Sequence, residues 1–230
     1  MKRLSKYSLF LFSIKINFMK IKPYRISKIS KYLKQDKLKI LDIGAGSHSA
    51  SITKKWFVNS LYHGVDISRN YYNNEEDISV MDKFYLMDLT KLDFDEIPND
   101  YFDLIILSHI IEHLYNGDKV IEALMSKLKQ GGVIYIEYPS FKSTKLPSMR
   151  ETLNFYDDPT HCRIYSLIEI YNLLMKNDFK ILEGGVRRSW INISLVPIKS
   201  LIQLISKGYI RAGVMWDICG FAEYAIAIKK

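Results

Sequence analysis

Cysteine is nearly absent from this sequence. Only Cys162 and Cys219 occur among 230 residues, and they form neither a CxxC pair nor a cluster with histidine. This scarcity argues against a disulfide framework and a structural zinc site and favours a reducing compartment, so we expect a cytoplasmic protein. Repeats and low-complexity tracts are lacking as well. With 48 % hydrophobic residues, the chain suits one globular domain with a full core.

Negative charge is lacking from the first part of the chain. Residues 1–40 contain 12 of the 33 basic residues but only one of the 25 acids, Asp36. The net charge of +8 is therefore the property of a basic N-terminal arm or helix, residues 1–37. Such an arm attracts anions, among them phospholipid, phosphate-bearing substrates and nucleic acid. Solvation alone is the alternative interpretation.

The sequence shows no good leader or membrane span near its start. Lys15 interrupts an apolar run over residues 7–14, no small-residue cleavage site follows, and the run is too short to cross a bilayer. We expect either an amphipathic segment that lies on a surface or a shorter chain that starts at Met19.

Hydrophobic periodicity predicts alternating strands and helices, and hence an α/β fold with helices on both faces of a sheet. Gly131 and Gly132 are predicted to cap a helix, and Ser166 with Glu169 to form a capping box. The predicted strands are residues 39–43, 61–67, 83–87, 102–108, 133–137, 179–183 and 223–228, and the predicted helices are 26–33, 49–59, 118–128 and 166–176.

Two long segments, residues 139–165 and 187–220, interrupt this alternation. Both follow predicted strands. In an open α/β sheet, the segments at the carboxyl ends of the strands carry the binding site. We therefore expect substrate recognition in these two segments.

Three consecutive predicted strands each end in a carboxylate: Asp42, Asp66 and Asp88. Gly44 and Gly46 follow Asp42, where the backbone can turn or approach a ligand closely. The third glycine of a dinucleotide fingerprint is missing. Three carboxylates suit a nucleoside with many donors and a cationic group, and they would repel a pyrophosphate. The alternative is that Asp42 and Asp66 cap helices or turns.

The ordered motifs identify a family that this sequence resembles. LDIGAGSHS, GVDIS, MDLT, FDLIILSHIIEHL and LKQGGVIYIEYP follow one another over residues 38–139, as in the class I S-adenosylmethionine-dependent methyltransferases. The resemblance implies a Rossmann-like sheet of seven strands, mostly parallel with an antiparallel last strand. It also implies S-adenosylmethionine as the cofactor and residues 38–230 as the methyltransferase domain, with a substrate-side insertion at about 187–220.

The resemblance further implies roles for single residues. Gly44 and Gly46 would let the backbone pass the methionine part, with Asp42 near its amino group, and the Ser108 carbonyl would face the methionine ammonium. On the nucleoside side the implied residues are Asp66 for the ribose hydroxyls, Ile67 beside it, Asp88 for the adenine amino group and the Leu89 amide beside the ring.

Motifs for some methyl acceptors are missing. The [ND]-P-P-[YFW] turn that accompanies methylation of amino groups on nucleobases or glutamine is replaced by Ser108-His109-Ile110-Ile111. A nucleophilic cysteine for pyrimidine carbon 5 is missing near the fourth strand as well. These absences leave sugar hydroxyls, other small molecules and RNA ribose as acceptors.

His109, Glu112 and His113 form an H-x-x-E-H cluster. On a helical turn, positions i, i+3 and i+4 share a face, so this trio could hold a metal ion. A Glu-His pair at this place also packs and orients the loop in small-molecule methyltransferases. We favour that role, and the sequence therefore predicts no metal site.

The stretch DDPTHCRIYS, residues 157–166, resembles bacterial methyltransferases found with polysaccharide, glycolipid and antibiotic-sugar synthesis. An alcohol is a poor nucleophile, and a histidine oriented by a carboxylate can take up its proton. We predict His161 as the base and Asp158, or Asp157, as its orienter. The alternative is a turn at Asp158-Pro159 with His161 closing a lid. The expected acceptor is a sugar hydroxyl on a small molecule or glycan, and the alternative reaction is RNA methylation through the basic arm.

The insertion at residues 187–220 is rich in apolar residues, with Ile198, Leu201, Ile202 and Ile205 at helical spacing. One interpretation is a helix that covers the sheet. The other is an apolar lid for a lipid-linked substrate, with peripheral contact at the inner membrane face.

Overall fold

A computed structural model describes residues 22–69 and 73–230 of the chain. The chain divides into two compact units between Lys34 and Gln35. In the first unit, helix α2 (Tyr24–Ile29) follows Pro23. This helix starts and ends earlier than predicted, because the fixed φ of proline favours a helix start directly after it. The apolar run at residues 7–14 lies outside the described residues, as does most of the predicted arm.

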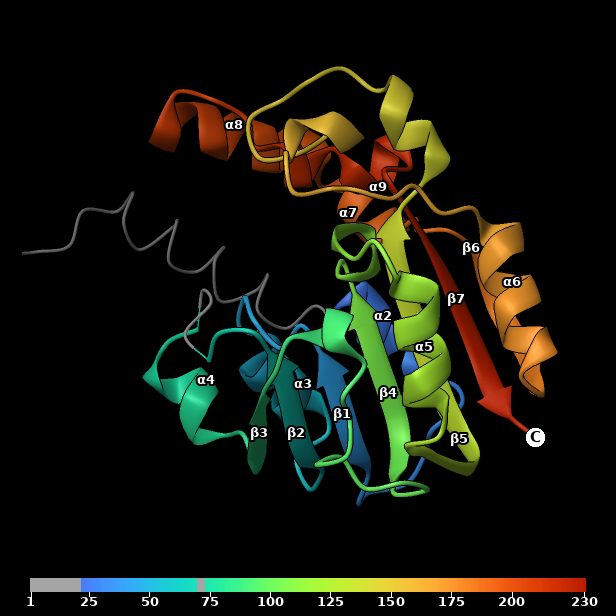
Figure 1. Ribbon diagram of the computed structural model, residues 1–230. Coiled ribbons are helices and arrows are strands. Elements are labelled where there is room, and N and C mark those ends of the chain that lie inside the picture. Colours follow the sequence, from blue (N-terminus) through green and yellow to red (C-terminus); the bar gives the residue numbers. More distant parts are fainter. Residues whose placement is uncertain (1–21, 70–72) are drawn as a thin grey trace, which may run out of the picture. The chain divides into compact units, whose positions relative to one another are not determined.

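In the described part of the second unit, seven strands form one sheet in the order β3-β2-β1-β4-β5-β7-β6 (Figure 1). All pairs among the first five strands are parallel, whereas β7 is antiparallel to both β5 and β6. This confirms the predicted Rossmann-like sheet. The strands are β1 (Lys39–Ile43), β2 (Leu61–Asp66), β3 (Lys83–Leu86), β4 (Phe102–Ser108), β5 (Leu128–Pro139), β6 (Phe179–Val186) and β7 (Ala222–Lys229).

Helices and single turns connect the strands. The Ser166 hydroxyl accepts a hydrogen bond from the Glu169 amide (3.3 Å), and Glu169 Oε2 accepts one from the Ser166 amide (2.8 Å), which confirms the predicted capping box. The helices of this unit are α3 (Ser49–Trp56), α4 (Glu75–Ser79), α5 (Gly117–Met125), α6 (Leu167–Lys176), α7 (Trp190–Ser194), α8 (Val196–Lys207) and α9 (Trp216–Cys219), and the 3-10 turns are η1 (Leu89–Lys91), η2 (Ile111–His113), η3 (Phe141–Lys145), η4 (Phe155–Asp157) and η5 (Ala212–Val214).

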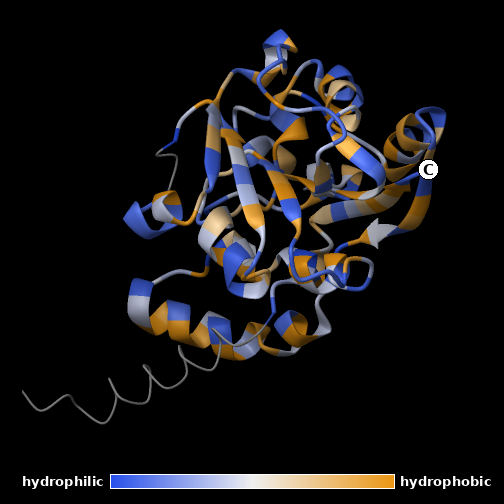
Figure 2. Ribbon diagram, turned by 90° about the horizontal axis from the view of Figure 1, so that it is seen from below, coloured by the Kyte–Doolittle hydropathy of each residue, from blue (hydrophilic) through white to orange (hydrophobic). Residues whose placement is uncertain are grey.

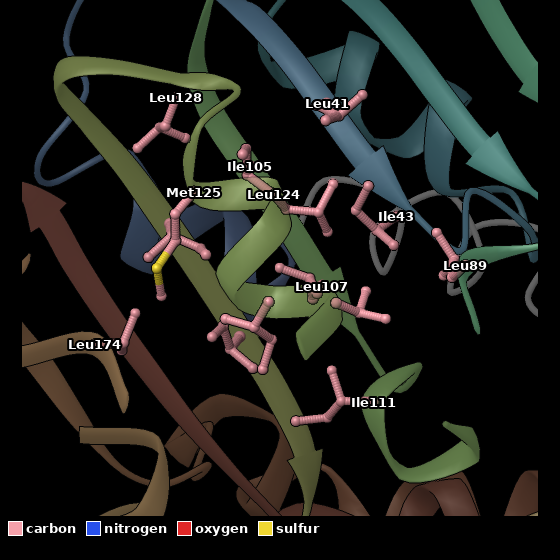
Figure 3. Close-up of a cluster of buried hydrophobic side chains, with 14 of the residues drawn as sticks. Leu41, Ile43, Leu89, Ile105, Leu107, Ile111, Leu124, Met125, Leu128 and Leu174 are labelled. Carbon is pink, nitrogen blue, oxygen red and sulfur yellow. The ribbon is translucent and has the colours of Figure 1, made fainter. Parts of the chain in front are cut away.

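The main core lies between the sheet and helices α5 and α6. Alternate residues of the strands, such as Leu41, Ile43 and Leu107, pack with Leu124 of α5 and Leu174 of α6 (Figure 3). Each such side chain contributes roughly 1.5–3 kcal/mol through burial. Because side chains alternate along a strand, the residues in between face the opposite side of the sheet.

The structure corrects the predicted role of Gly131 and Gly132. Helix α5 ends at Met125 with Ser126 as its C-cap, and the glycines lie inside β5. The register between β4 and β5 shifts between Phe102 and Leu104. Gly131 has φ +74°, a conformation that glycine adopts without strain. The two glycines thus lie where the pairing of β5 with β4 is irregular, and not at the end of a helix.

The two long segments pack together beside the carboxyl ends of β4 and β5 (Figure 1). They share a small core of Leu153 from the first segment with Ala212, Phe221 and Ala222 from the second segment and the start of β7. Helix α8 confirms the predicted helical spacing in the insertion and carries alternating apolar and polar residues (Figure 2). Within the described ranges, helices long and apolar enough to cross a membrane are lacking.

Candidate active site

The predicted cofactor residues lie at the carboxyl ends of four neighbouring strands. β3, β2, β1 and β4 run parallel to one another, so these ends meet at one edge of the sheet. The direction of strand order changes between β1 and β4, which is where ligands bind in open α/β sheets. The residues that the topology brings to this edge are Asp42 near the end of β1, Gly44 and Gly46 after β1, Asp66 at the end of β2, Ile67 after β2, Asp88 and Leu89 after β3, and Ser108 at the end of β4.

Asp42 is buried near the end of β1, just before the glycine loop, residues 44–48. Its carboxylate Oδ2 accepts hydrogen bonds from the Tyr62 hydroxyl (2.6 Å) and from the Ser49 hydroxyl. These bonds connect β1 with β2 and with the first residue of α3. The partners that the structure shows for Asp42 are protein groups, and its role toward a cofactor amino group stays a prediction.

Gly44 occupies a position that requires glycine. Its φ is +74°, and a Cβ atom there would lie 3.1 Å from the Ile110 side chain. The Gly44 and Ala45 amides donate to the Val65 carbonyl at 2.8 and 3.1 Å. The loop therefore turns tightly over the end of β2, as the motif predicts.

The missing third glycine is replaced by residues in a glycine-like conformation. Ser47 and His48 have φ values of +52° and +63°, which costs a residue with a Cβ atom about 1–2 kcal/mol. His48 Nδ1 lies 2.5 Å from the buried carboxylate Oδ2 of Asp77, and the His48 amide donates to Asn73 Oδ1 at 3.2 Å. Sequence reasoning missed Asp77, whose only local signal is the cap that it forms with Asn74.

The nucleoside side combines a buried acid with an exposed apolar side chain. Asp66 Oδ1 accepts a hydrogen bond from the Ser68 amide (3.0 Å), and burial raises the pKa of Asp66. Ile67, the next residue, has 71 % of its surface exposed. The carboxylate can accept hydrogen bonds from the hydroxyls of a ribose. The exposed apolar side chain beside it can contact the flat base of the same nucleoside.

Asp88 and Leu89 begin the turn η1. Asp88 Oδ1 accepts from the Thr90 amide (3.0 Å) and the Thr90 hydroxyl (2.6 Å), and these bonds hold the pKa of Asp88 below its ordinary value. The Leu89 side chain is buried in the core (Figure 3). The side chain of Leu89 is therefore used by the core, and the role of its amide stays a prediction.

His109 lies at the end of β4 in a left-handed conformation (φ +54°), before the turn η2. The H-x-x-E-H cluster therefore does not form one helical face. His109 Nδ1 lies 3.2 Å from Glu112 Oε1, and its Nε2 lies 3.1 Å from Glu137 Oε1. Burial alone lowers the pKa of His109, but the two carboxylates raise it to about 9. His109 is thus charged at neutral pH.

Glu137 extends this network into the insertion. Arg187 Nη1 lies 3.6 Å from Glu137 Oε1, and Arg187 Nε lies 3.7 Å from Asp217 Oδ1. Burial raises the pKa of Glu137, but Arg187 and His109 outweigh it and lower this pKa to about 2. Sequence reasoning missed all three residues. An acid within the apolar stretch IYIEYP was the one available signal.

His161 lies in a mostly buried position close to Glu112 and His113. Its Nδ1 donates to the Phe155 carbonyl (2.6 Å), and its Nε2 lies 4.0 Å from Asp158 Oδ2. Burial lowers the pKa of His161. The orienting hydrogen bond thus comes from a backbone carbonyl, while Asp158 lies beside the other ring nitrogen.

Asp157, the alternative orienter, serves the backbone instead. Its Oδ2 accepts from the amides of Met149 (3.2 Å), Leu153 (2.9 Å) and Asn154 (2.8 Å). The catalytic roles of His161 and Asp158 stay predictions.

Two cavities lie on this side of the sheet. The smaller one, about 120 Å³, is lined by the cluster of Glu112, His113 and His161 together with Trp216. The larger one, about 560 Å³, is lined by Lys199, Arg211 and other residues of the insertion. Thr152 and Trp216 line both cavities, so the two volumes adjoin.

The fold is that of the S-adenosylmethionine-dependent methyltransferases. Residues 19–183 match the methyltransferase domain family. The chain belongs to this family, which confirms the predicted enzyme class and, with it, the cofactor of that class.

One curated relative is similar to part of this chain. An uncharacterized protein of Methanocaldococcus jannaschii is 30 % identical over 165 residues, which are 66 % of this chain and 43 % of that protein. The chain thus spans less than half the length of this curated relative.

Solved structures share the fold at low identity. A SAM-dependent methyltransferase from Archaeoglobus fulgidus is similar with a TM-score of 0.56 and 23 % identity, over 89 % of this chain and 91 % of that one. A methyltransferase from Mesorhizobium loti gives 0.62 and 14 %, over 90 % and 98 %. The phosphoethanolamine N-methyltransferase 2 of Haemonchus contortus, solved with S-adenosylhomocysteine, gives 0.63 and 16 %, over 87 % and 51 %.

Proposed function

We propose that this protein transfers the methyl group of S-adenosylmethionine to a hydroxyl of a small-molecule or glycan acceptor, most readily a sugar. The observation that carries the proposal is the placement of two different half-sites at one sheet edge. Acids that suit a nucleoside lie near the carboxyl ends of β1, β2 and β3, and a cavity lined by histidines lies beside the end of β4.

The residues at the first half-site fit the cofactor. Asp66 and Asp88 offer acceptors to the hydroxyls and the amino group of a nucleoside, Ile67 offers an apolar face, and the tight turn at Gly44 keeps side-chain atoms out of the way. S-adenosylmethionine, when bound, supplies an electrophilic methyl group on a sulfonium. The contribution of this chain is then to position the acceptor, exclude water and remove a proton.

His161 is the proposed proton acceptor. Because Nδ1 donates to the Phe155 carbonyl, Nε2 carries the lone pair. The lowered pKa of His161 keeps the imidazole neutral and able to accept a proton. During the transfer, Nε2 of His161 would take up the proton that the acceptor hydroxyl loses. Asp158 Oδ2, 4.0 Å away, then stabilises the imidazolium.

The larger cavity supports an acceptor with acidic groups. Lys199 and Arg211 line it, and both come from the insertion. Lys199 Nζ donates to Asn192 Oδ1 (2.9 Å), and Arg211 forms an ion pair with Glu151. A sugar phosphate or uronic acid entering from this side would meet these cations before it reaches His161.

We further propose a cytoplasmic location with peripheral membrane contact. The support is the exposed apolar surface of α8, where Ile198, Leu201 and Ile205 are exposed, together with the basic composition of residues 1–37. The N-terminal arm also keeps RNA as an alternative acceptor, as its charge attracts phosphate.

Calorimetric titration with S-adenosylhomocysteine tests whether the protein binds the cofactor. A screen for transfer of a radiolabelled methyl group to sugars, sugar phosphates, lipid-linked glycans and RNA tests which acceptor it uses. We expect that the protein binds S-adenosylhomocysteine and that the label appears in a glycan fraction. Lack of cofactor binding contradicts the proposal. Label in RNA, lost when residues 1–37 are removed, favours the alternative acceptor.

A further inference from the structure

Glu112, His113 and His161 come together from two segments that are distant in the sequence. One ligand atom from each residue lies within 4.8 Å of the other two. Ligand atoms that share a Zn²⁺ ion at about 2.0–2.2 Å are about 3.4 Å apart in a tetrahedral site. Small rotations of the three side chains therefore bring them to coordination distance.

The Glu112 carboxylate provides an independent observation. The residue is 1 % exposed, and its Oε2 atom is buried without a hydrogen-bond partner in residues 22–69 and 73–230. A buried carboxylate oxygen that lacks a partner is destabilising, and natural structures satisfy such atoms with a donor, a water or a cation. Glu112 also lines the same cavity as the two histidines, which places the unsatisfied group where an ion would bind.

The hydrogen bonds of the two histidines select the ligating tautomer. His161 Nδ1 donates to the Phe155 carbonyl (2.6 Å). His113 Nδ1 lies 2.8 Å from the Thr160 hydroxyl, whose own proton goes to Asp158 Oδ1 (2.6 Å). The hydroxyl therefore accepts from His113 Nδ1. Both histidines thus keep their lone pair on Nε2. The Phe155 carbonyl and the Thr160 hydroxyl fix the orientation of the two rings, as such acceptors do for metal-binding histidines.

His109 has a different task. One of its nitrogens faces Glu112 Oε1 and the other faces Glu137 Oε1. It holds one oxygen of the Glu112 carboxylate and leaves the second oxygen to a further partner. The H-x-x-E-H spacing suggests a metal trio of His109, Glu112 and His113. In the structure, His161 takes the place of His109 in the trio that comes together.

We propose that Glu112, His113 and His161 bind one divalent transition-metal ion, such as Zn²⁺, with the adjoining cavity leaving a coordination position open. Two imidazoles and one carboxylate form the ligand set of open transition-metal sites. This departs from the sequence-based expectation of no metal. This site rests on the proposed methyl transfer for its use, and it changes the role of His161: with the ion bound, Nε2 is a ligand and no longer the base. The ion would then take over that task, since it would meet the acceptor oxygen and promote loss of its proton to solvent.

Metal binding is tested directly on tag-free, full-length protein after chelator treatment. Isothermal titration with ZnCl₂ gives stoichiometry and affinity, and titration with CoCl₂ gives the visible absorption of the bound ion. We expect one Zn²⁺ per chain with micromolar or tighter affinity. Glu112→Gln, His113→Gln and His161→Gln should each weaken it at least tenfold and abolish the Co²⁺ bands. His48→Gln is the matched control, since His48 also contacts a buried carboxylate but lies in another loop.

The outcomes separate the metal site from the proposed function. Wild-type protein that binds S-adenosylhomocysteine but no Zn²⁺ or Co²⁺ overturns the metal site alone. Unchanged affinity in His161→Gln does the same. Metal binding without cofactor binding overturns the proposed function alone. Circular dichroism of each variant shows that it folds, and a misfolded Glu112→Gln leaves the two histidine variants to decide.

Discussion

The Tyr62 hydroxyl donates a 2.6 Å hydrogen bond to the buried carboxylate of Asp42 on the neighbouring strand. The same carboxylate oxygen accepts from Ser49. These two bonds link β2 and the first residue of α3 to the end of β1, where the glycine loop begins. We therefore expect a change in this buried network to affect both the stability of the fold and the loop at the proposed cofactor site.

Tyr62→Phe removes one donor from this buried carboxylate. We expect the free energy of unfolding to fall by about 1–3 kcal/mol, because a charged acceptor loses a partner in the interior. Urea denaturation measures the change. Tyr115→Phe, at a side chain that is 72 % exposed, should change it by less than about 0.5 kcal/mol. Equal values for the two variants would contradict a structural role for the Tyr62 hydroxyl.

Asp66→Ala should weaken binding of S-adenosylhomocysteine at least tenfold, since the ribose hydroxyls lose their carboxylate acceptor. Calorimetric titration measures the dissociation constant. Asp100→Ala is the control, because Asp100 is exposed and pairs with Lys229 far from the ligand edge. Affinity that stays the same in Asp66→Ala would remove this residue from the cofactor site.

His161→Gln should lower kcat by roughly 10²- to 10⁴-fold, as expected when a group that removes a proton is lost. The affinity for S-adenosylhomocysteine should stay within about twofold, because His161 lies on the acceptor side. Steady-state kinetics with an acceptor from the screen gives kcat. Full activity would show that Nε2 has no part in the reaction, whether as base or as metal ligand.

Asp157 predicts a pH dependence of stability. Burial raises its pKa, but the Ser148 hydroxyl and the amides of Met149, Leu153 and Asn154 outweigh burial and hold the pKa below its ordinary value. The carboxylate is therefore stabilising above its unfolded pKa of about 3.9, and this contribution is lost as the pH falls through the folded pKa.

The expected signature is a stability difference that shrinks in acid. Wild type should exceed Asp157→Asn in free energy of unfolding at about pH 7, and the gap should close toward about pH 3. Urea denaturation across this range measures it. A gap that stays constant with pH would show that the difference comes from packing and not from the charge.

Substitutions of His48 test how much its left-handed conformation, at the position of the missing third glycine, costs in stability. His48→Gly should change the free energy of unfolding by less than about 1 kcal/mol, because relief of the left-handed strain offsets loss of the contact with Asp77. His48→Val should destabilise by about 2 kcal/mol, as it keeps the strain and loses the contact. Denaturation of the two variants side by side gives the comparison. Equal stability would mean that the strain is negligible.

The sequence predicts those parts of the fold that depend on local patterns. β4 (Phe102–Ser108) matches its apolar run, and the Ser166–Glu169 cap and the sheet type follow from short motifs. Gly131 and Gly132 were misassigned because the irregularity they serve arises only when β5 pairs with β4. Local periodicity carries no information about such pairing.

The same limit applies to the candidate site. Asp42, Asp66 and Asp88 are predictable because each lies near the carboxyl end of its own strand. The contacts of His109 with Glu137, and the approach of His161 to Glu112, join segments that are distant in the chain. These contacts depend on how residues 139–165 pack against the insertion, which no local motif encodes.

The small core shared by Leu153, Ala212, Phe221 and Ala222 has a consequence for how this enzyme can change. It joins the two segments that contribute to the lining of both cavities, while the proposed cofactor residues lie on the sheet and its main core. Substitutions in one structural layer can thus accumulate without disturbing the other. A protein built this way can acquire a new acceptor when residues 139–165 and 187–220 change together. Protein engineers can attempt the same change by grafting both segments at once.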